Sequence, residues 1–262
     1  MADAVRTSIS GEGAVLEVVL DRPKANAIDA ATSREMSRVF ADFRDDPALR
    51  VAILTGGGER FFSAGWDLNA AADGEAFEAD YGEGGFGGFV ELPDRTKPVI
   101  CAVNGICCGG GLEIALSCDL ILAADTASFA LPEIRSGTVA DAASIKLPKR
   151  IPYHVAMDLL LTGRWFDANE ALQWGLIREI CSQDSLLDKT WDLARLLASG
   201  PPLVYAAIKE VVREAEDMRF QDMLNRVSKR QLATVDRLYG SEDQLEGARA
   251  FAEKRDPVWK GK

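Results

Sequence analysis

The sequence has little positive charge and a single histidine. Its 262 residues include 30 Lys and Arg against 41 Asp and Glu, which gives a formal net charge of −11 at pH 7. Nucleic acids and anionic membrane surfaces are bound through clustered Lys and Arg, so this charge balance opposes both as partners. An anionic ligand must therefore be held by local groups.

Long apolar runs are also missing. No run approaches the roughly 20 residues that a membrane-spanning helix needs. The first residues, MADAVRTSIS, lack the basic-then-apolar layout of a secretory signal. We expect a cytoplasmic protein with no membrane partner, and the length allows one large domain or two small ones.

Cysteines are few and do not form a metal-binding or redox pattern. There are five, at positions 101, 107, 108, 118 and 181, an odd number that does not suggest a disulfide framework. Cys107 and Cys108 are adjacent rather than in C-x-x-C spacing, and the only histidine, His154, is far from them in sequence. We therefore expect no metal site and interpret the cysteines as small apolar core residues.

Segments with strand and helix patterns alternate along the first part of the chain. The runs 15–21, 50–56, 98–105 and 119–125 are rich in β-branched or apolar residues, and residues 112–118 have a helical pattern. Strands that alternate with helices are typical of an α/β fold.

A helix is expected between the first two of these strands. Thr32 and Glu35 have the spacing of a capping box. The apolar residues that follow recur on one helical face, namely Met36, Phe40 and Phe43.

The second part of the chain is predominantly helical in pattern. Asp167, Glu170 and Gly175 have the positions of a cap, a first-turn acid and a stop. A further helix is expected to start at the prolines 201 and 202, with Leu203, Ala207 and Val211 on one face. Residues 73–91 mix glycines, six acids and aromatics without a base or a clear period, and predict a mobile loop.

The stretch NGICCGGGLE, residues 104–113, is the first candidate site. Its glycines fit neither the dinucleotide nor the P-loop spacing, and a cysteine nucleophile would need a neighbouring base. A glycine run before a helix does allow a ligand to approach the unpaired N–H groups at the positive helix end, which suits an oxyanion such as an enolising thioester. Glu113 in this helix and Glu133 after a later strand are candidates for a general acid and base, provided that they converge.

The sequence resembles the enoyl-CoA hydratase/isomerase (crotonase) superfamily over nearly its whole length. The resemblance rests on LDRPKANAID, FFSAGWDL, KPVICAVNGICCGGGLEIALSCD and SFALPEIRSG. Within the superfamily the likeness is greatest to bacterial enzymes that act on carnitine-derived CoA thioesters, through DRPKANAIDA, SAGWDLNAAADGEA and the terminal FAEKRDPVWKGK.

The resemblance implies a fold, an assembly and a chemistry. The fold is an α/β spiral of repeated ββα units over residues 1–195, with a helical trimerisation region at 196–262. The assembly is a homotrimer or a dimer of trimers. The reaction is reversible hydration of a short acyl-CoA, without a metal or an organic cofactor other than the coenzyme A of the substrate.

The resemblance also assigns residues. The backbone N–H groups of Trp66 and Gly110 correspond to the oxyanion hole. Glu113 corresponds to the residue that holds or activates water at Cβ, and Glu133 to the one that exchanges the proton at Cα. The positions that correspond to CoA contacts are Lys24, Ala25, Ala64, Asp67 and Leu68, together with Phe251 and Lys254, which reach a CoA in a neighbouring subunit.

Two segments bear on the acyl group. Members of the family that the sequence resembles commonly carry a Pro and a Gly-Gly pair after the strand of the second glutamate, whereas residues 138–147 here contain several alanines; the resemblance implies a segment one residue shorter than in those members. Asp141 lies in this segment and corresponds to a base or nucleophile in some relatives. In the 73–91 loop, an ammonium head group would find aromatic rings and acids, and the candidate rings are Phe77, Tyr81, Phe86 and Phe89. A flexible acidic loop that merely covers the site is the alternative.

Two other functions remain open from sequence. One is a general short-chain enoyl-CoA hydratase or isomerase of fatty-acid oxidation. The other is a non-catalytic scaffold or RNA-binding protein that keeps the fold. The acidic balance and the presence of both glutamates oppose the second of these.

Overall fold

The computed structural model describes residues 4–10, 13–76 and 78–262. In these ranges the strands form two sheets, and the larger has six strands in the order β1-β2-β3-β5-β7-β10. Adjacent strands of this sheet from β2 to β10 are parallel, and β1 pairs antiparallel with β2. Its strands are β1 (Val5–Ser10), β2 (Val15–Leu20), β3 (Val51–Gly56), β5 (Val99–Val103), β7 (Leu120–Ala124) and β10 (Glu179–Cys181).

The smaller sheet alternates with the larger one along the chain. Within the same residues its order is β4-β6-β8-β9, and its strands are β4 (Phe61–Ser63), β6 (Ile106–Cys108), β8 (Ser128–Ala130) and β9 (Phe166–Asp167). The pairs β3–β4, β5–β6 and β7–β8 each place one strand in each sheet, and each pair is followed by a helix. These helices are α2 (Leu68–Ala72), α3 (Gly110–Ser117) and α4 (Glu133–Ser136). The chain therefore makes the ββα repeats that were expected, and it places the start of each helix beside the end of a strand of the smaller sheet.

The central strands are buried because both faces of the larger sheet are covered. Every residue of β3 and β5 is buried, which matches their unbroken apolar runs. Helix α8 (Leu186–Ala198) packs on this sheet against β2, β3, β5 and β7. All five cysteines are buried and free, so their interpretation as core residues is confirmed.

Helix α1 (Ala30–Asp45) begins three residues earlier than a cap at Thr32 predicts. Its N-cap is Asp29, whose side chain accepts a hydrogen bond from the Thr32 N–H at 2.8 Å. The prediction that Thr32 caps this helix is therefore wrong, because Thr32 already lies within the first turn. Met36, Phe40 and Phe43 are buried as expected.

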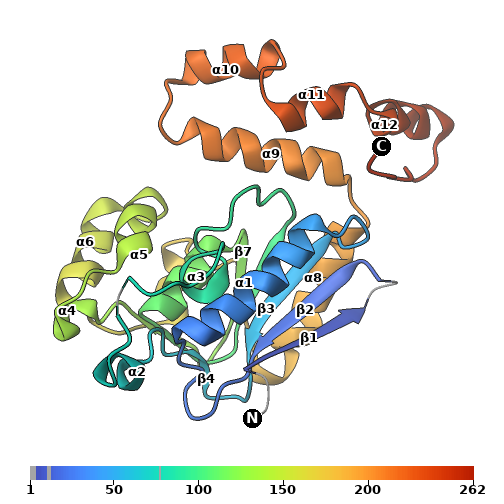
Figure 1. Cartoon of the computed structure of the whole chain (residues 1–262). Helices are drawn as coiled ribbons and strands as arrows, with labels where there is room; N and C mark the ends of the chain where they lie inside the picture. The colour runs from blue at the N-terminus through green and yellow to red at the C-terminus, as the bar shows by residue number, and fades with distance from the viewer. Residues whose placement is uncertain (1–3, 11–12, 77) are drawn as a thin grey trace.

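The last helices form an arm beyond the sheets (Figure 1), and Lys209 of the arm joins it to them through Asp119 Oδ2 at 2.6 Å and the Lys97 carbonyl at 2.8 Å. It consists of α9 (Pro202–Ala215), α10 (Phe220–Ser228), α11 (Ala233–Tyr239) and α12 (Glu242–Glu253). Their own small core joins Ala207, Met223, Leu232 and Val235. The boundary expected after residue 195 falls within α8, and the arm begins at Pro202; the division into two domains stays a prediction.

The remaining short elements lie between α4 and α8 or in the 73–91 loop. They are α5 (Asp141–Lys146), α6 (Tyr153–Thr162), α7 (Ala168–Gln173), and the 3-10 turns η1 (Phe86–Gly88), η2 (Leu147–Lys149) and η3 (Gln183–Ser185). Asp167 caps α7 through the Glu170 N–H, as expected. Among the residues that the structure describes, no helix is long and apolar enough to cross a membrane.

Candidate active site

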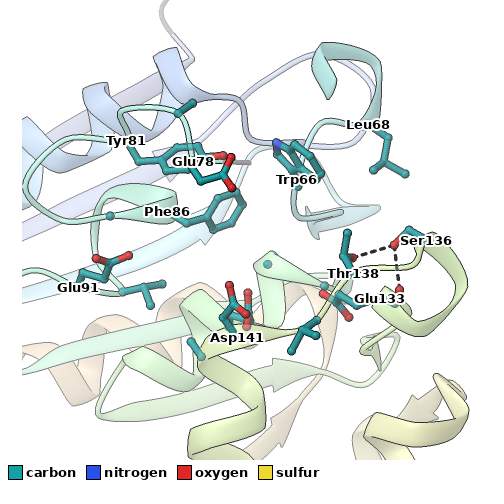
Figure 2. A pocket seen from close by; sticks show the side chains of 18 of the residues that line it. Trp66, Leu68, Glu78, Tyr81, Phe86, Glu91, Glu133, Ser136, Thr138 and Asp141 are labelled. Atoms are coloured by element: carbon teal, nitrogen blue, oxygen red, sulfur yellow. Dashed lines mark hydrogen bonds between the residues drawn. The ribbon is translucent and has the colours of Figure 1, made fainter. Parts of the chain in front are cut away.

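A cavity of about 490 Å³ lies where the 73–91 loop faces the starts of α3, α4 and α5. Figure 2 shows Glu78, Tyr81 and Phe86 of the loop on one wall, with Trp66 beside them and Glu133 and Asp141 on the opposite wall. Both expected glutamates, Glu113 and Glu133, line this cavity. The structure thus brings together carboxyl groups that are 20 positions apart in the sequence.

The glycines of NGICCGGGLE shape the start of α3. Gly109 has φ 56° and ψ −133°, a conformation that favours glycine, and α3 begins at Gly110. As the first residue of the helix, Gly110 has no carbonyl one turn earlier to which its N–H can bond within the helix. Gly65 has φ +79°, and a Cβ placed there would lie 2.6 Å from the Gly110 nitrogen. The two expected oxyanion segments, around Trp66 and Gly110, are therefore in close backbone contact.

The Trp66 segment is held by backbone hydrogen bonds on both sides. The Ile28 N–H donates to the Gly65 carbonyl at 2.8 Å, and the Asp67 N–H donates to the Ile28 carbonyl at 2.9 Å. The Trp66 indole N–H donates to Glu75 Oε1 at 3.2 Å. Trp66 lines the cavity and is fixed at its backbone and at its ring.

Arg22, in the motif LDRPKANAID, is bonded to Asp67 in the motif FFSAGWDL and so connects the two motifs. Its guanidinium lies 2.5 Å from Asp67 Oδ2 and 2.6 Å from Asp29 Oδ2, and it also donates to the Ala27 carbonyl at 2.8 Å. Burial raises the pKa of Asp67, but hydrogen bonds from Arg22 and from the Asn69 N–H outweigh burial and hold this pKa below its usual value. Asp67 also caps α2, so its side chain is engaged in structure rather than directed to the cavity.

Glu113 lies in the first turn of α3 and is held by α5. Its Oε1 accepts a hydrogen bond from the Ala143 N–H at 2.9 Å. Burial raises the pKa of Glu113; the Ala143 and Ala142 N–H groups lower it, and the negative charge of Asp141 raises it further. The net direction is upward, although the hydrogen bonds favour the charged form.

Glu133 begins α4 and lies in a different environment. Its Oε2 is buried and has no hydrogen-bond partner among the described residues. Burial raises the pKa of Glu133 to about 7; the carboxyl's bond to its own N–H opposes this, and the charges of Glu113 and Asp141 add to it. A carboxyl with a pKa near 7 can both give and take a proton at neutral pH.

The segment that follows α4 forms a wall of the cavity. Thr138, Val139, Asp141 and Ala142 line it. Within this segment α5 begins at Asp141, and the Ala143 N–H in its first turn is the donor to Glu113. This alanine-containing stretch thus supplies a donor to Glu113.

The cysteines of the motif do not have the environment of a nucleophile. Burial, and then the charge of Glu133, raise the pKa of the Cys108 thiol to about 11. Burial raises the pKa of Cys107 well above its usual value. Both thiols are therefore protonated at neutral pH, and a thiolate mechanism is not supported.

The four candidate rings of the loop lie in different places. Tyr81 and Phe86 line the cavity, with ring centroids 5.8 Å apart. Phe89 does not line it: the side chain is buried, with its ring centroid 4.6 Å from that of Phe40. Phe77 lies outside the described residues.

Only some of the residues expected to contact CoA line the cavity. Ala64 and Leu68 line the cavity, whereas Lys24 and Ala25 lie in the adjoining turn, where the Ala64 N–H donates to the Ala25 carbonyl at 3.0 Å. Lys24 has φ 76°, a left-handed conformation that turns the chain there. Phe251 and Lys254 belong to the arm, and Phe251 is 89% exposed, so neither reaches the cavity of its own chain.

Three residues of the site were not singled out from sequence. Glu75 holds the Trp66 indole, Arg22 holds Asp67, and Ala143 donates to Glu113. The partners are 9, 45 and 30 positions apart in the sequence, respectively, and no local pattern indicates such pairs. Within the ranges 4–10, 13–76 and 78–262, no three His, Cys, Asp or Glu side chains form a group that could hold a metal ion.

Comparison with known proteins identifies the family to which the chain is similar. A family model described as enoyl-CoA hydratase/isomerase matches residues 10–262. A carnitinyl-CoA dehydratase from Citrobacter koseri is 53% identical over 251 residues, covering 95% of this chain and 96% of that protein. A carnitinyl-CoA dehydratase from Proteus mirabilis is 51% identical over 255 residues, covering 97% and 98%.

Solved structures agree with the fold. An enoyl-CoA hydratase from Mycobacterium marinum superposes with a TM-score of 0.89 at 37% identity, covering 99% of this chain and all of that one. One from Bacillus anthracis superposes with a TM-score of 0.88 at 30% identity over 99% of this chain and all of that one. The two-sheet ββα architecture is thus shared with experimentally determined hydratases.

Proposed function

The chain belongs to the enoyl-CoA hydratase/isomerase family, and from this premise we propose that it is a hydro-lyase that interconverts carnitinyl-CoA and crotonobetainyl-CoA. The observation that carries the proposal is the pair of carboxyl groups, Glu113 and Glu133, on one cavity at the start of α3. The names of the two bacterial relatives support the choice of acyl group.

The thioester oxygen is proposed to bind between the N–H groups of Trp66 and Gly110. A Cα proton next to a thioester is only weakly acidic, so adding or removing it requires the charge that develops on oxygen to be stabilised. Two backbone donors at a helix start supply this without reorganisation, and one such donor contributes about 10²–10³-fold in rate. The contact between Gly65 and Gly110 supports this arrangement, because it sets the distance between the two segments.

The two carboxyl groups are proposed to divide the proton transfers. In hydration, Glu113 takes a proton from water as the oxygen bonds to Cβ, and Glu133 gives its proton to Cα. In dehydration, Glu133 takes the Cα proton and Glu113 protonates the leaving hydroxyl. The proton then returns from one carboxyl to the other, so the pair holds one proton at the start of every turnover. The different environments of the two groups support this division.

Coenzyme A is proposed to enter as part of the substrate, with no other cofactor. Ala64 and Leu68 line the cavity and are proposed to contact CoA beside the thioester. Lys24, Ala25 and Asp67, in the adjoining segments, are proposed to contact CoA as well. Phe251 and Lys254 are proposed to reach CoA from a neighbouring subunit, in keeping with their place on the exposed arm.

A second candidate, hydration of simple short-chain enoyl-CoA thioesters, is favoured by one observation. The superposed structures from Mycobacterium marinum and Bacillus anthracis are enoyl-CoA hydratases. The same two carboxyl groups and oxyanion donors would serve that reaction, so the candidates differ only in the acyl group.

The test is a substrate panel with the purified protein. Crotonobetainyl-CoA, crotonyl-CoA and a longer enoyl-CoA are incubated separately, and mass spectrometry follows the gain of one water. We expect crotonobetainyl-CoA to have the highest kcat/KM. Turnover of crotonyl-CoA in preference to it would support the second candidate, and no hydration of any thioester would refute the hydro-lyase proposal.

A further inference from the structure

The cavity has an acidic and aromatic end that simple enoyl hydration does not require. We call it the loop end, and its residues are Glu78, Tyr81, Phe86 and Glu91. Figure 2 shows Glu78 and Tyr81 together, with Phe86 below them and Glu91 beyond Phe86. Among the described residues that line the whole cavity there is no Lys, Arg or His.

The two rings of the loop end form a corner. Tyr81 and Phe86 have centroids 5.8 Å apart and an interplanar angle of 74°, an edge-to-face contact. The Phe86 ring lies against the start of α3, because a Cβ placed on Gly110 would be 2.3 Å from Phe86 Cε1. This ring is therefore next to the backbone proposed to bind the thioester oxygen.

The carboxylates of the loop end lie around this corner. Burial and the charges of Glu75 and Glu78 raise the pKa of the Tyr81 hydroxyl, which keeps the ring neutral. Glu91 lies beside the backbone before Phe86, because a Cβ placed on Gly85 would be 2.4 Å from Glu91 Oε1. The nearby cations Arg44 and Arg34 are engaged elsewhere, with Glu83 at 2.6 Å and with the Asp80 carbonyl at 2.7 Å.

An apolar acyl chain gains nothing from these carboxylates. They repel the negative charge that develops on the thioester oxygen, and they raise the cost of deprotonating Glu113 and Glu133. A cation on the acyl chain reverses both effects. A quaternary ammonium has no N–H to donate, so it is recognised by aromatic faces and by nearby negative charge rather than by hydrogen bonds.

We propose that the loop end binds the quaternary ammonium group of the acyl chain and so selects a cationic substrate; this inference rests on the function proposed above. The ammonium nitrogen of crotonobetainyl-CoA is two bonds from Cβ, about 2.5 Å. It must therefore lie beside the carboxyl groups that act on Cα and Cβ, and Phe86 of the loop end faces this point, because its ring contacts Gly110 in the turn of α3 that carries Glu113. Tyr81 and Phe86 supply the faces, and Glu78 and Glu91 the charge.

The decisive comparison uses a neutral substrate of the same shape. In 5,5-dimethylhex-2-enoyl-CoA a tert-butyl group replaces the trimethylammonium group, so only the charge differs. For the wild type we expect kcat/KM to be at least about 30-fold higher with crotonobetainyl-CoA, the factor that a desolvated cation–π contact of about 2 kcal/mol represents.

Variants of the loop end test which residues cause this preference for the charged substrate. Tyr81→Leu is expected to lower kcat/KM for crotonobetainyl-CoA about 10-fold and to leave the tert-butyl analogue nearly unchanged, while Tyr81→Phe recovers most of the loss. The double variant Glu78→Gln/Glu91→Gln is expected to lower it several-fold, with a smaller effect at high salt. The double variant Asp73→Asn/Glu83→Gln is the matched control, because it removes two carboxylates of the same loop that do not line the cavity.

The outcomes separate this inference from the proposed function. Equal turnover of the two isosteres by the wild type, or an equal loss on both in Tyr81→Leu, would overturn the ammonium site while the hydro-lyase activity stands. An effect of Asp73→Asn/Glu83→Gln as large as that of Glu78→Gln/Glu91→Gln would also overturn it, since net charge alone would then explain the preference. Failure to hydrate any thioester would refute the proposed function itself.

Discussion

Glu113 and Glu133 differ in what surrounds each carboxyl group. Glu113 accepts a backbone hydrogen bond from α5, whereas Glu133 Oε2 has no partner among the residues described. Burial raises the pKa of both groups and so favours their protonated forms, but Glu113 also accepts backbone hydrogen bonds from α5 that favour its charged form. In the proposed mechanism this difference sets the starting state, with the proton on Glu133.

A pH profile follows from this starting state. The pair must hold one proton, so kcat/KM is expected to fall as the pH rises through about 7, the pKa of Glu133 in the free protein. Hydration consumes no net proton, so the equilibrium constant does not depend on pH. The hydration and dehydration profiles must therefore have the same shape.

Asp141→Asn tests the electrostatic part of this account. Asp141 raises the pKa of both glutamates through its negative charge. Removing that charge lowers the pKa of Glu133, so the falling limb of the kcat/KM profile is expected to move to lower pH. A limb that stays in place or moves to higher pH would contradict the account, and a loss of activity at every pH would instead indicate a direct role of Asp141 in the reaction.

The sequence predicts the site residues that stand in motifs, but it does not predict which aromatic rings of the loop face the cavity. Both glutamates and Gly110 stand in motifs, and the structure brings them to one cavity. Phe89 shares the composition of the loop with Tyr81 and Phe86, but Gly87 and Gly88 both have positive φ, and Phe89 is buried beyond them. Composition cannot show which ring faces a cavity, because the direction of each ring depends on the turns of the backbone.

At the scale of elements, the site depends on close backbone approach. A Cβ on Gly65 would lie 2.6 Å from the Gly110 nitrogen and 2.8 Å from the Cys108 carbonyl oxygen. Both contacts are with backbone, which cannot rotate away as a flexible side chain can. The turn after β4 and the turn after β6 are therefore matched in shape.

Gly65→Ala is expected to separate these two turns. We expect kcat to fall by about 100-fold or more, as on removal of an oxyanion donor, and the free energy of unfolding to fall by more than the strain of a positive φ explains. The matched control is Gly58→Ala, which has φ +76° but no atom within 4 Å of the added Cβ. In the control, the free energy of unfolding is expected to fall by about 1–2 kcal/mol, and kcat is expected to stay near that of the wild type. Chemical denaturation and steady-state kinetics measure both, and equal losses in the two variants would contradict this account.

The elements themselves were largely predictable, with informative exceptions. The long apolar runs gave β2, β3, β5 and β7, because a buried parallel strand needs no alternation. The start of α1 was misplaced because Asp29 and Thr32 both satisfy capping rules, and only the fold decides between them. Strand β6 was not predicted, since its three residues are too few for a pattern.

At the scale of the whole molecule, the arm presents apolar side chains that its own chain does not cover. Figure 1 shows α9 to α12 beyond the two sheets. Exposed apolar side chains on α9 and α10 include Ile208, Val212, Phe220 and Leu224. Contiguous exposed apolar surface is typical of a protein interface, and the resemblance implies that the partner is another copy of this chain.

We therefore predict a homotrimer or a dimer of trimers. Light scattering after size exclusion is expected to give three or six times the 28.4 kDa of one chain. The double variant Ile208→Asp/Val212→Asp is expected to lower this mass, because it places charges in the interface; Leu161→Asp, at an exposed position of α6 away from the arm, serves as its control. A wild type that is monomeric at micromolar concentration would contradict the prediction.

The most direct test of the central claim is the hydration rate of crotonobetainyl-CoA in Glu113→Gln, Glu133→Gln and the double variant. A glutamine keeps the size of the side chain and removes the exchangeable proton, so each single change is expected to lower kcat by about 10²–10⁴-fold. Because the two groups act in one step, the double variant is expected to be little slower than the slower single variant. If either single variant stays within tenfold of the wild type, two-carboxyl catalysis in this cavity is contradicted.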